Sequence, residues 1–251
     1  MTAPRATIVL PAYNEHESIV TALRRIDDAV SVSHEILVVV DSEADATIAA
    51  AQDEISRMPH ARVVVQDYGR GPANAVRYGI DHAEAPCVVV TMADGSDDVR
   101  VIDDLVRLVE RGFVVASASR YMPGGAQRGG PVGKRLMSEA AGRSLNLFAR
   151  VGTRDVTNAF KAYDTAFVRE VGIDSRSGFE IAIELVSKAR RARRPVAEIP
   201  TIWLDREAGA SNFKIRAWLP KYLYWYAFAF GPAVPQESVR ARVSSKVRGS
   251  R

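Results

Sequence analysis

The chain has 251 residues, 47% of them hydrophobic and 25% charged, with a formal net charge of +4. This composition predicts one large domain with a full core and shorter appendages. A single cysteine, Cys87, excludes a disulfide framework and fits a reducing compartment. No run of 18 apolar residues exists and Met1 to Arg5 leads directly into a strand, so neither a membrane-spanning helix nor a signal peptide is expected.

The first 111 residues alternate between strands and helices. Short β-branched runs predict strands at Ala6 to Leu10, Glu35 to Val40, Ala61 to Gln66 and Cys87 to Thr91. Apolar residues at helical spacing predict helices at Ser18 to Ala29, from after Asp45 to about Met58, at Ala73 to Ala83 and at Val101 to Arg111. We expect Asn14 to cap the first helix. Four alternations predict βαβ units and a doubly wound α/β sheet.

The fourth strand ends in a cluster of carboxylates. The segment Cys87 to Asp98, CVVVTMADGSDD, begins as an apolar run typical of a strand buried on both faces. Ligands of open α/β sheets bind beyond the carboxyl ends of such strands, so Asp94, Asp97 and Asp98 lie where a polar ligand would dock. Carboxylate oxygens there suit a hard divalent cation with a diphosphate, although an ordinary helix cap is the alternative.

The pattern changes after residue 112. We expect a strand at Phe113 to Ser119, a glycine-rich loop at Pro123 to Gly133 and an amphipathic helix at Gly133 to Val151. Arginines border the apolar arc of that helix, so it can lie in a membrane interface or pack on a sheet. Further predicted elements are strands at Asp155 to Tyr163 and Val196 to Trp203, with a helix from about Glu180 to Arg193 between them.

The C-terminal part is aromatic and then basic. Residues 216–235 form a predicted amphipathic segment dense in Trp, Tyr and Phe around Pro220, which favours a boundary between water and an apolar phase. Residues 236–251 form a basic tail, expected to be flexible, after a domain at residues 1–215. Lys188 to Arg194 carries five further cations. Such runs are commonly solvated surface; anionic lipid is a possible partner, whereas nucleic acid is not expected.

Eight short motifs occur in an order that resembles one enzyme family. They are LPAYNE (Leu10 to Glu15), the strand-end Asp41, GRGPANAVRYG (Gly69 to Gly79), MADGS (Met92 to Ser96), ASRY (Ala118 to Tyr121), DVTNAFKAY (Asp155 to Tyr163), GFE (Gly178 to Glu180) and DREAGASNFK (Asp205 to Lys214). Together they resemble family 2 glycosyltransferases of the GT-A fold, and within them the dolichol-phosphate or polyprenyl-phosphate mannosyl- and glucosyltransferases. The resemblance covers about residues 6 to 215.

The resemblance implies an inverting transfer of a sugar from a nucleotide sugar, of the GDP-mannose or UDP-glucose type, to a polyprenyl phosphate. It implies Mg²⁺ or Mn²⁺ at Asp94 and Ser96, and peripheral attachment to the cytoplasmic face of a membrane. The implied donor contacts are Pro11, Ala12, Tyr13, Glu15, Asp41, Arg70, Gly71, Ala93, Asp94 and Lys214. Arg120, Lys134 and Ser138 are implied to bind the acceptor phosphate, and Arg206 with Lys214 to close over the pyrophosphate.

Two positions depart from the family's pattern. Met92 stands where the metal motif Asp-x-Asp has its first aspartate, and a thioether is a poor ligand for Mg²⁺ or Mn²⁺. The cation would then depend on Asp94, Ser96 or Asp97, water and the substrate, or the motif would be shifted to Asp97 and Asp98. The paired aspartates after the second strand are Val40 and Asp41 here.

The sequence is also compatible with two other functions. A hydroxyl acceptor would need a carboxylate base, for which Asp155, Glu180 and Asp97 are candidates. Alternatively, Met92 would fit a non-catalytic domain that only binds a nucleotide sugar. A phosphate acceptor is already an anion near neutral pH and attacks without a base, which agrees with the lack of an evident catalytic triad.

Overall fold

The computed structural model describes residues 3–176, 178–205 and 215–239. The strands are β1 (Ala6–Pro11), β2 (His34–Val40), β3 (Ala61–Val65), β4 (Cys87–Val90), β5 (Val115–Ser119), β6 (Ala126–Arg128), β7 (Lys161–Asp164), β8 (Val196–Pro200) and β9 (Ile202–Leu204). The helices are α1 (Glu17–Ala29), α2 (Ala46–Arg57), α3 (Pro72–Asp81), the 3₁₀-helix η1 (Val99–Val101), α4 (Ile102–Glu110), α5 (Val132–Ser144), the π-helix η2 (Leu145–Ala149), α6 (Thr165–Val171), α7 (Ile181–Arg191) and α8 (Ile215–Ala229).

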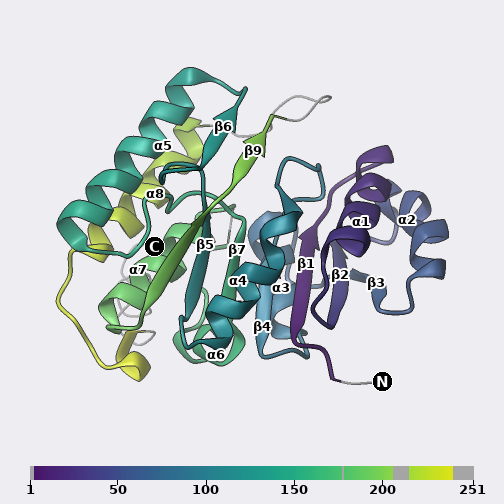
Figure 1. Ribbon diagram of the computed structural model, residues 1–251, viewed down its shortest axis with the longest axis horizontal. Coiled ribbons are helices and arrows are strands. Elements are labelled where there is room, and N and C mark those ends of the chain that lie inside the picture. The colour runs from purple at the N-terminus through teal and green to yellow at the C-terminus, as the bar shows by residue number, and fades with distance from the viewer. Residues whose placement is uncertain (1–2, 177, 206–214, 240–251) are drawn as a thin grey trace.

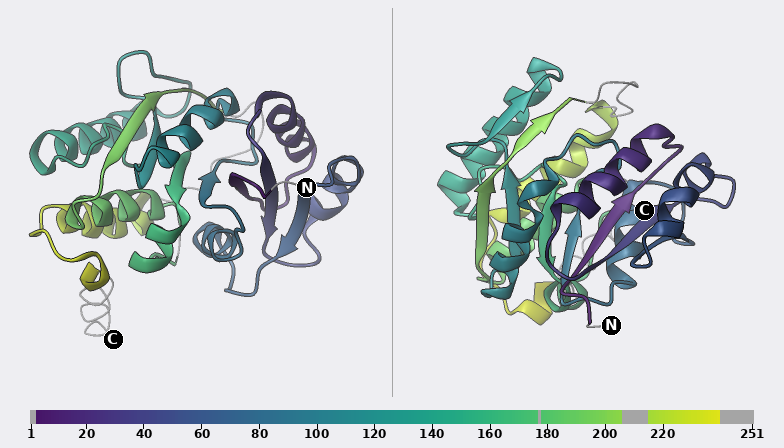
Figure 2. Two further views of the ribbon diagram at one scale, coloured as in Figure 1. Left: turned by 60° about the horizontal axis from the view of Figure 1, so that its bottom comes forward. Right: turned by 45° about the vertical axis from the view of Figure 1, so that its right-hand side comes forward.

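Seven strands form one mixed sheet in the order β3-β2-β1-β4-β7-β5-β8 (Figure 1). β1, β2, β3 and β4 pair in parallel, as do β5 and β8, whereas β7 runs antiparallel to both of its neighbours. Helices cover both faces of the sheet (Figure 2). The predicted doubly wound α/β architecture is therefore confirmed, and the antiparallel β7 makes the sheet mixed.

Alternating residues of the central strands enter two separate cores. On β1, Ile8 and Leu10 join the core that contains the apolar faces of α1 and α4, while Val9 joins the core with α3, α6 and α7. β2 and β4 divide their valines in the same way. This explains the continuous β-branched runs in the sequence, because a strand covered by helices on both faces has no polar side.

Three local expectations are wrong. Asn14 does not cap α1; it adopts a left-handed conformation with φ 51°, and the helix begins after His16 without a side-chain cap. The predicted strand from Asp155 is a strand only at β7, because residues before it form a loop held by side-chain hydrogen bonds. The helix predicted to end at Val151 leaves the α conformation at Ser144 and finishes as η2, which stops at the left-handed Arg150.

The second half of the chain builds a separate layer at the β8 edge of the sheet. Figure 1 shows α5 along this edge, beside the small β6–β9 sheet, with α8 behind it. Several apolar side chains of the α5–η2 arc face solvent instead of a core; Leu136 is 56% exposed and Phe148 is 70% exposed. None of the helices in the described part of the chain has the length and apolar character needed to cross a membrane.

Candidate active site

The ends of β1, β2 and β4 lie side by side because these strands are parallel. Pro11 at the end of β1 pairs in register with Val39, and the amide of Ala12 donates to Val39 O at 2.9 Å. Asp41 follows β2 directly, and Met92 to Asp94 follow β4. Residues that the sequence placed in one donor site therefore meet at one edge of the sheet.

Asp41 fixes the glycine-rich loop before α3. Its Oδ2 accepts the amide of Gly71 at 2.9 Å, and its Oδ1 accepts Gln66 Nε2 at 2.7 Å. Gln66 also donates to Gly69 O at 2.6 Å. Gly69 and Gly71 have φ values of +94° and +118°, which favour glycine. The loop thus brings the exposed Arg70 and the N-terminus of α3 to the ends of the parallel strands.

The loop after β1 is fastened to α2. The amide of Asn14 donates to Asp45 Oδ1 at 3.0 Å, and the amide of Glu15 donates to Thr47 Oγ1 at 2.9 Å. Asp45 is also the side-chain cap of α2. These bonds hold the loop while Tyr13 remains 61% exposed, so its ring is available to a ligand at the strand ends.

The loop after β4 is held from α1. Arg25 Nη1 donates to Gly95 O at 2.7 Å and Nη2 to Asp97 O at 3.2 Å. Asp94 Oδ1 accepts the amide of Ser96 at 3.0 Å, and Asp94 remains half-buried, whereas Ser96 is 3% exposed. Asp94 is therefore the carboxylate of this loop best placed for a ligand.

Asp97 occupies a different environment from Asp94. Its Oδ2 accepts Thr91 Oγ1 and the amide of Met92, both at 3.0 Å. Its Oδ1 is buried and has no hydrogen-bond partner among the described residues. Burial disfavours the ionised form and raises the pKa of Asp97 to about 6, and the nearby Asp94 adds to this effect. Asp97 thus anchors the start of the loop.

The donor set fits a divalent cation that is shared with a ligand. Within the described ranges no cluster of three His, Cys, Asp or Glu side chains could hold a metal ion. Asp94 offers hard oxygen ligands, and the orphaned Oδ1 of Asp97 leaves a second carboxylate oxygen unsatisfied nearby. A hard cation here would need further oxygens from water and from a bound phosphate.

The predicted acceptor residue Arg120 is already ion-paired. Its Nε donates to Asp155 Oδ2 at 2.7 Å and its Nη2 to Asp155 Oδ1 at 2.9 Å, with the side chains 11% and 0% exposed. The attraction of Arg120 holds the pKa of Asp155 below its ordinary value despite burial. The ring of Tyr121 lies 4.9 Å from the guanidinium carbon. Nη1 has no hydrogen-bond partner within the part of the chain that the structure describes.

Ser138 joins the same network from α5. Its Oγ accepts Tyr121 Oη at 3.1 Å and forms a short hydrogen bond with Thr157 Oγ1. Arg120 Nη2 donates to Thr157 Oγ1 at 3.2 Å and reaches Ser138 Oγ at 3.5 Å. α5 approaches this closely because Gly142 faces the backbone of Arg154, where a Cβ would collide with the carbonyl oxygen. Two predicted acceptor residues, Arg120 and Ser138, are thus in contact.

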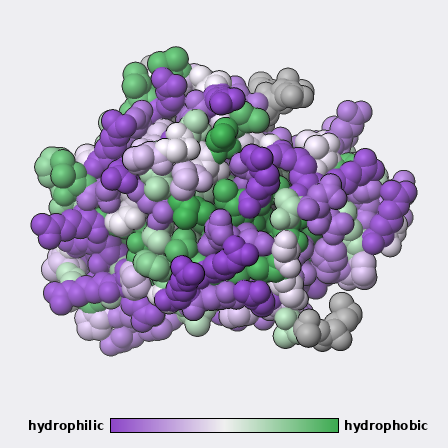
Figure 3. Space-filling model, viewed as in Figure 1, coloured by the Kyte–Doolittle hydropathy of each residue, from purple (hydrophilic) through white to green (hydrophobic). Residues whose placement is uncertain are grey.

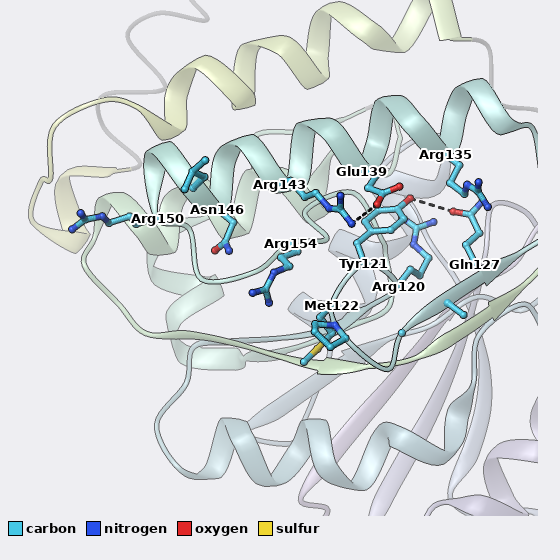
Figure 4. Close-up of a pocket in the computed structure, with 14 residues that line it drawn as sticks. Arg120, Tyr121, Met122, Gln127, Arg135, Glu139, Arg143, Asn146, Arg150 and Arg154 are labelled. Carbon is cyan, nitrogen blue, oxygen red and sulfur yellow. Dashed lines mark hydrogen bonds and ion pairs between the residues drawn. The ribbon is translucent and has the colours of Figure 1, made fainter.

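A groove of about 1080 Å³ opens beside this network (Figure 4). Five arginines line it, together with apolar Met122, Pro123 and Leu147; they are Arg120, Arg135, Arg143, Arg150 and Arg154. Among the described residues that line the groove, Glu139 is the one carboxylate, and it pairs with Arg143 at 2.6 Å. Figure 4 shows arginines from α5 and from the segment below it on both sides of the groove. An anion with an apolar substituent matches this lining.

Lys161 lies under the network at the start of β7. It is fully buried and its Nζ donates to Asp155 O at 2.9 Å and to Asn158 O. Burial lowers the pKa of Lys161 to about 8, against the attraction of Asp155. Its bonds fix the backbone that presents Asp155 to Arg120.

The remaining predicted site residues divide into two groups. Lys134 lies on α5 one helical turn before Ser138, outside the lining of the groove. Arg206 and Lys214 lie outside the described residues.

Sequence reasoning did not find the roles of Arg25, Asp155, Thr157 or Arg154 in these contacts. Arg135, Arg143 and Arg150 had a signal, since they edge the predicted amphipathic helix; the others depend on pairings distant in sequence.

Comparisons with known proteins identify relatives of the chain. Residues 7–172 match the model of glycosyl transferase family 2. The chain is 30% identical to a polyprenol monophosphomannose synthase of Mycolicibacterium smegmatis, over 85% of this chain and 86% of the relative. It is 29% identical to a dolichol-phosphate mannosyltransferase of Pyrococcus furiosus, over 84% of this chain but 59% of that relative.

A solved structure shares the fold. The mannosyltransferase PcManGT from Pyrobaculum calidifontis, in complex with GDP-Man and Mn²⁺, superimposes with a TM-score of 0.63 at 16% identity, covering 100% of this chain and 71% of that one. The match to the family model spans most of the chain, and the fold agrees. The protein belongs to glycosyltransferase family 2 and has the GT-A fold.

Proposed function

We propose that the protein transfers a sugar from a nucleotide sugar to a polyprenyl phosphate at a membrane surface. The observation that carries the proposal is the arginine-lined, partly apolar groove beside the strand-end site. Its lining suits a lipid phosphate, and similarity to a polyprenol monophosphomannose synthase supports the same acceptor class. A GDP-mannose-type donor is favoured over a UDP-glucose-type donor by the mannosyltransferase relatives.

The nucleotide would bind at the ends of β1 and β2. Tyr13 would stack or hydrogen-bond with it, while Pro11, Ala12 and Glu15 shape the loop around it. Asp41 would act mainly by holding Gly71, so that backbone amides approach the donor and Arg70 lies near its charge. Ala93 and Asp94 would lie under the diphosphate, and Arg206 with Lys214 would close over it.

Asp94 would hold a Mg²⁺ or Mn²⁺ ion together with donor oxygens, with Ser96 positioning its carboxylate. When bound, the cation would stabilise negative charge on the departing nucleoside diphosphate. Met92 supplies no oxygen, so we expect looser metal binding than an Asp-x-Asp pair would give.

The acceptor phosphate would enter the groove and contact Arg120 Nη1. Ser138 would hold Arg120 and Tyr121 in place, and Lys134, one helical turn before Ser138 on α5, would add positive charge beside the groove. Arginine donors orient a phosphate strongly because their hydrogen bonds are charge-assisted. The attacking oxygen is an anion already, so no residue needs to remove a proton. The candidate bases fit this view: Asp155 is paired with Arg120, and Asp97 and Glu180 are buried. Direct attack at the anomeric carbon would invert its configuration.

Peripheral attachment to the cytoplasmic face of the membrane belongs to the same proposal. A polyprenyl chain remains in the bilayer, so the groove must open at its surface. α5, η2 and α8 carry exposed apolar side chains close to arginines, as membrane-interface helices do.

An Asp94→Asn variant tests the proposal with purified protein, polyprenyl phosphate, a labelled nucleotide sugar and Mn²⁺. Removing the charge at nearly constant shape should lower transfer at least about a hundredfold, as losses of transition-state electrostatic contacts do. Asp98→Asn is the matched control, since Asp98 pairs with Arg100 at 2.7 Å on the same loop and should retain most activity. Equal activity of both variants, or no transfer by the unmodified protein from any donor, would refute the proposed function.

A further inference from the structure

A second arginine-lined groove lies at the end of η2, on the far side of Arg150 from the acceptor groove. It has a volume of about 720 Å³ between η2, the end of α7 and the start of β8. Arg150, Arg190, Arg193 and Arg194 line it, and none of the described residues that line it is acidic. Four cations without a carboxylate create a local positive potential. The donor and acceptor sites proposed for sugar transfer do not use this charge.

The arginines of this groove differ in their contacts. Arg190 connects two helix ends, since its Nε donates to Ala149 O at 3.0 Å and its Nη1 to Gly231 O. Arg193 and Arg194 are exposed, and neither side chain forms a hydrogen bond or ion pair with any described residue. The backbone turn after α7, with Arg193 at φ 54° and the amide of Arg194 donating to Ala189 O, directs the chain into β8.

Exposed apolar side chains stand at the same corner. Leu147 and Phe148 on η2 are 69% and 70% exposed, and Phe230 at the end of α8 is 45% exposed. Phe148 precedes Ala149 and Phe230 precedes Gly231, whose carbonyl groups both accept from Arg190. The backbone of both phenylalanines therefore lies next to residues that Arg190 of the basic groove contacts. In Figure 3, hydrophobic surface interrupts the hydrophilic surface along the edge of the molecule where α5 and η2 lie.

We infer that this corner is the docking site for an anionic phospholipid bilayer: Leu147, Phe148 and Phe230 enter the interface while Arg193 and Arg194 bind lipid phosphates. Bulky apolar residues beside cations are what an anionic interface favours, because it contributes both hydrophobic burial and charge attraction. The docking site adjoins the acceptor groove, because Leu147 lines that groove and Arg150 lines both grooves, whereas Phe148, Arg193 and Arg194 do not line the acceptor groove. The inference rests on the proposed membrane association and names the lipid class and the residues.

Vesicle sedimentation of the full chain tests the inference. The probes are phosphatidylcholine vesicles with and without phosphatidylglycerol. Arg193→Gln with Arg194→Gln should weaken binding to the anionic vesicles by about thirtyfold at low salt, since each cation near such a surface contributes about 1 kcal/mol. The matched control is Arg57→Gln with Arg62→Gln, which removes the same charge at the β3 edge, opposite β8 in the sheet. The control should bind like the unmodified protein.

Phe148→Ser provides an independent arm. It should weaken binding to both vesicle types by about ten- to a hundredfold, as burying a phenylalanine side chain contributes roughly 1.5–3 kcal/mol. Val65→Ser, on β3 and 38% exposed, is its apolar control. Equal loss in both arginine pairs would mean that only net charge acts, and no loss in the Arg193/Arg194 pair would mean that the corner does not dock; either result overturns the inference.

A transfer assay with detergent-dissolved, short-chain polyprenyl phosphate separates this inference from the proposed function. The Arg193/Arg194 and Phe148 variants should retain transfer there, because none of these residues lies in the donor site or the acceptor groove. Transfer in detergent without any binding to anionic vesicles overturns the docking site and leaves the enzyme assignment intact. If the unmodified protein binds anionic vesicles but transfers no sugar, the enzyme assignment is overturned and the docking site is retained.

Discussion

Arg120 and Asp155 form a buried bidentate ion pair, and this changes what a substitution of Arg120 would report. Removing one partner of such a pair leaves an uncompensated charge in the protein interior. A substitution of Arg120 should therefore lower the stability of the fold, in addition to any effect on acceptor binding.

We expect Arg120→Met to lower the free energy of unfolding by about 3–5 kcal/mol, the usual cost of breaking a buried pair. Adding Asp155→Asn, which removes the unpaired charge at nearly constant shape, should recover a large part of that loss. Chemical denaturation of both single variants and the double variant measures the coupling. Strictly additive losses would show that the pair contributes no mutual stabilisation.

Lys161 gives the protein a specific pH dependence. Its folded pKa, about 8, lies below the ordinary value of 10.5 because the side chain is buried. Between these values the unfolded chain holds a proton that the folded protein has lost, so stability should rise with pH, by at most about 1.4 kcal/mol per unit. This gain is present above pH 10.5 and is lost as pH falls to 8.

Lys161→Met should remove that rise. Urea denaturation at several pH values across this window compares the two proteins, and the difference curve isolates Lys161 from the other titrating groups. A difference that stays constant over the whole window would contradict the shifted pKa.

At the scale of elements, the close packing of α5 against the backbone of Arg154 depends on the absence of a side chain at Gly142. Alanine is the better helix former, yet here its Cβ would meet the carbonyl of Arg154. We expect Gly142→Ala to destabilise the protein by about 1–3 kcal/mol, the usual cost of overpacking, and to displace Ser138 from Thr157.

Gly133→Ala in the same helix is the control, since nothing lies within 4 Å of its added Cβ. It should be neutral or stabilise by up to about 1 kcal/mol. Thermal unfolding of both variants gives the comparison. A stable Gly142→Ala protein would mean that α5 does not pack against the Arg154 backbone as the structure has it.

The sequence predicted elements well where a local pattern determines them. The valine runs of β1, β2 and β4 predict buried strands because both faces are covered, and the helical spacing of α1 predicts its buried face. Asn14, by contrast, has the residue type of a helix cap but turns left-handed, because its amide and side chain bond to α2. A local pattern in one sequence does not reveal a hydrogen bond between residues about thirty positions apart.

The same limit applies to the candidate site. Asp94 and Asp41 could be located because both follow a recognisable strand. The partner of Arg120 could not, since Asp155 is 35 positions away and lay within a predicted strand. The exposed arc of α5 and η2 was ambiguous for a similar reason: an amphipathic pattern does not say whether a sheet or a bilayer covers it.

The whole molecule places two kinds of site on one sheet. The parallel half, β3 to β4, presents loops at its strand ends that suit a nucleotide and its diphosphate. The other half adds β7 in the antiparallel direction, with α5 and the small β6–β9 sheet, around the arginine-lined groove. Asp97 and Arg120 lie close enough to influence each other's charge, which brings the two sites together.

The most direct test of the central claim is sugar transfer to a polyprenyl phosphate compared with transfer to the polyprenol of the same chain length. The arginine groove should select the phosphate, and no free carboxylate base lines the groove among its described residues to deprotonate an alcohol. Transfer to the alcohol should be at least about a hundredfold slower, the usual contribution of a missing general base. Equal or faster transfer to the alcohol would contradict the lipid-phosphate assignment and favour an enzyme with a hydroxyl acceptor.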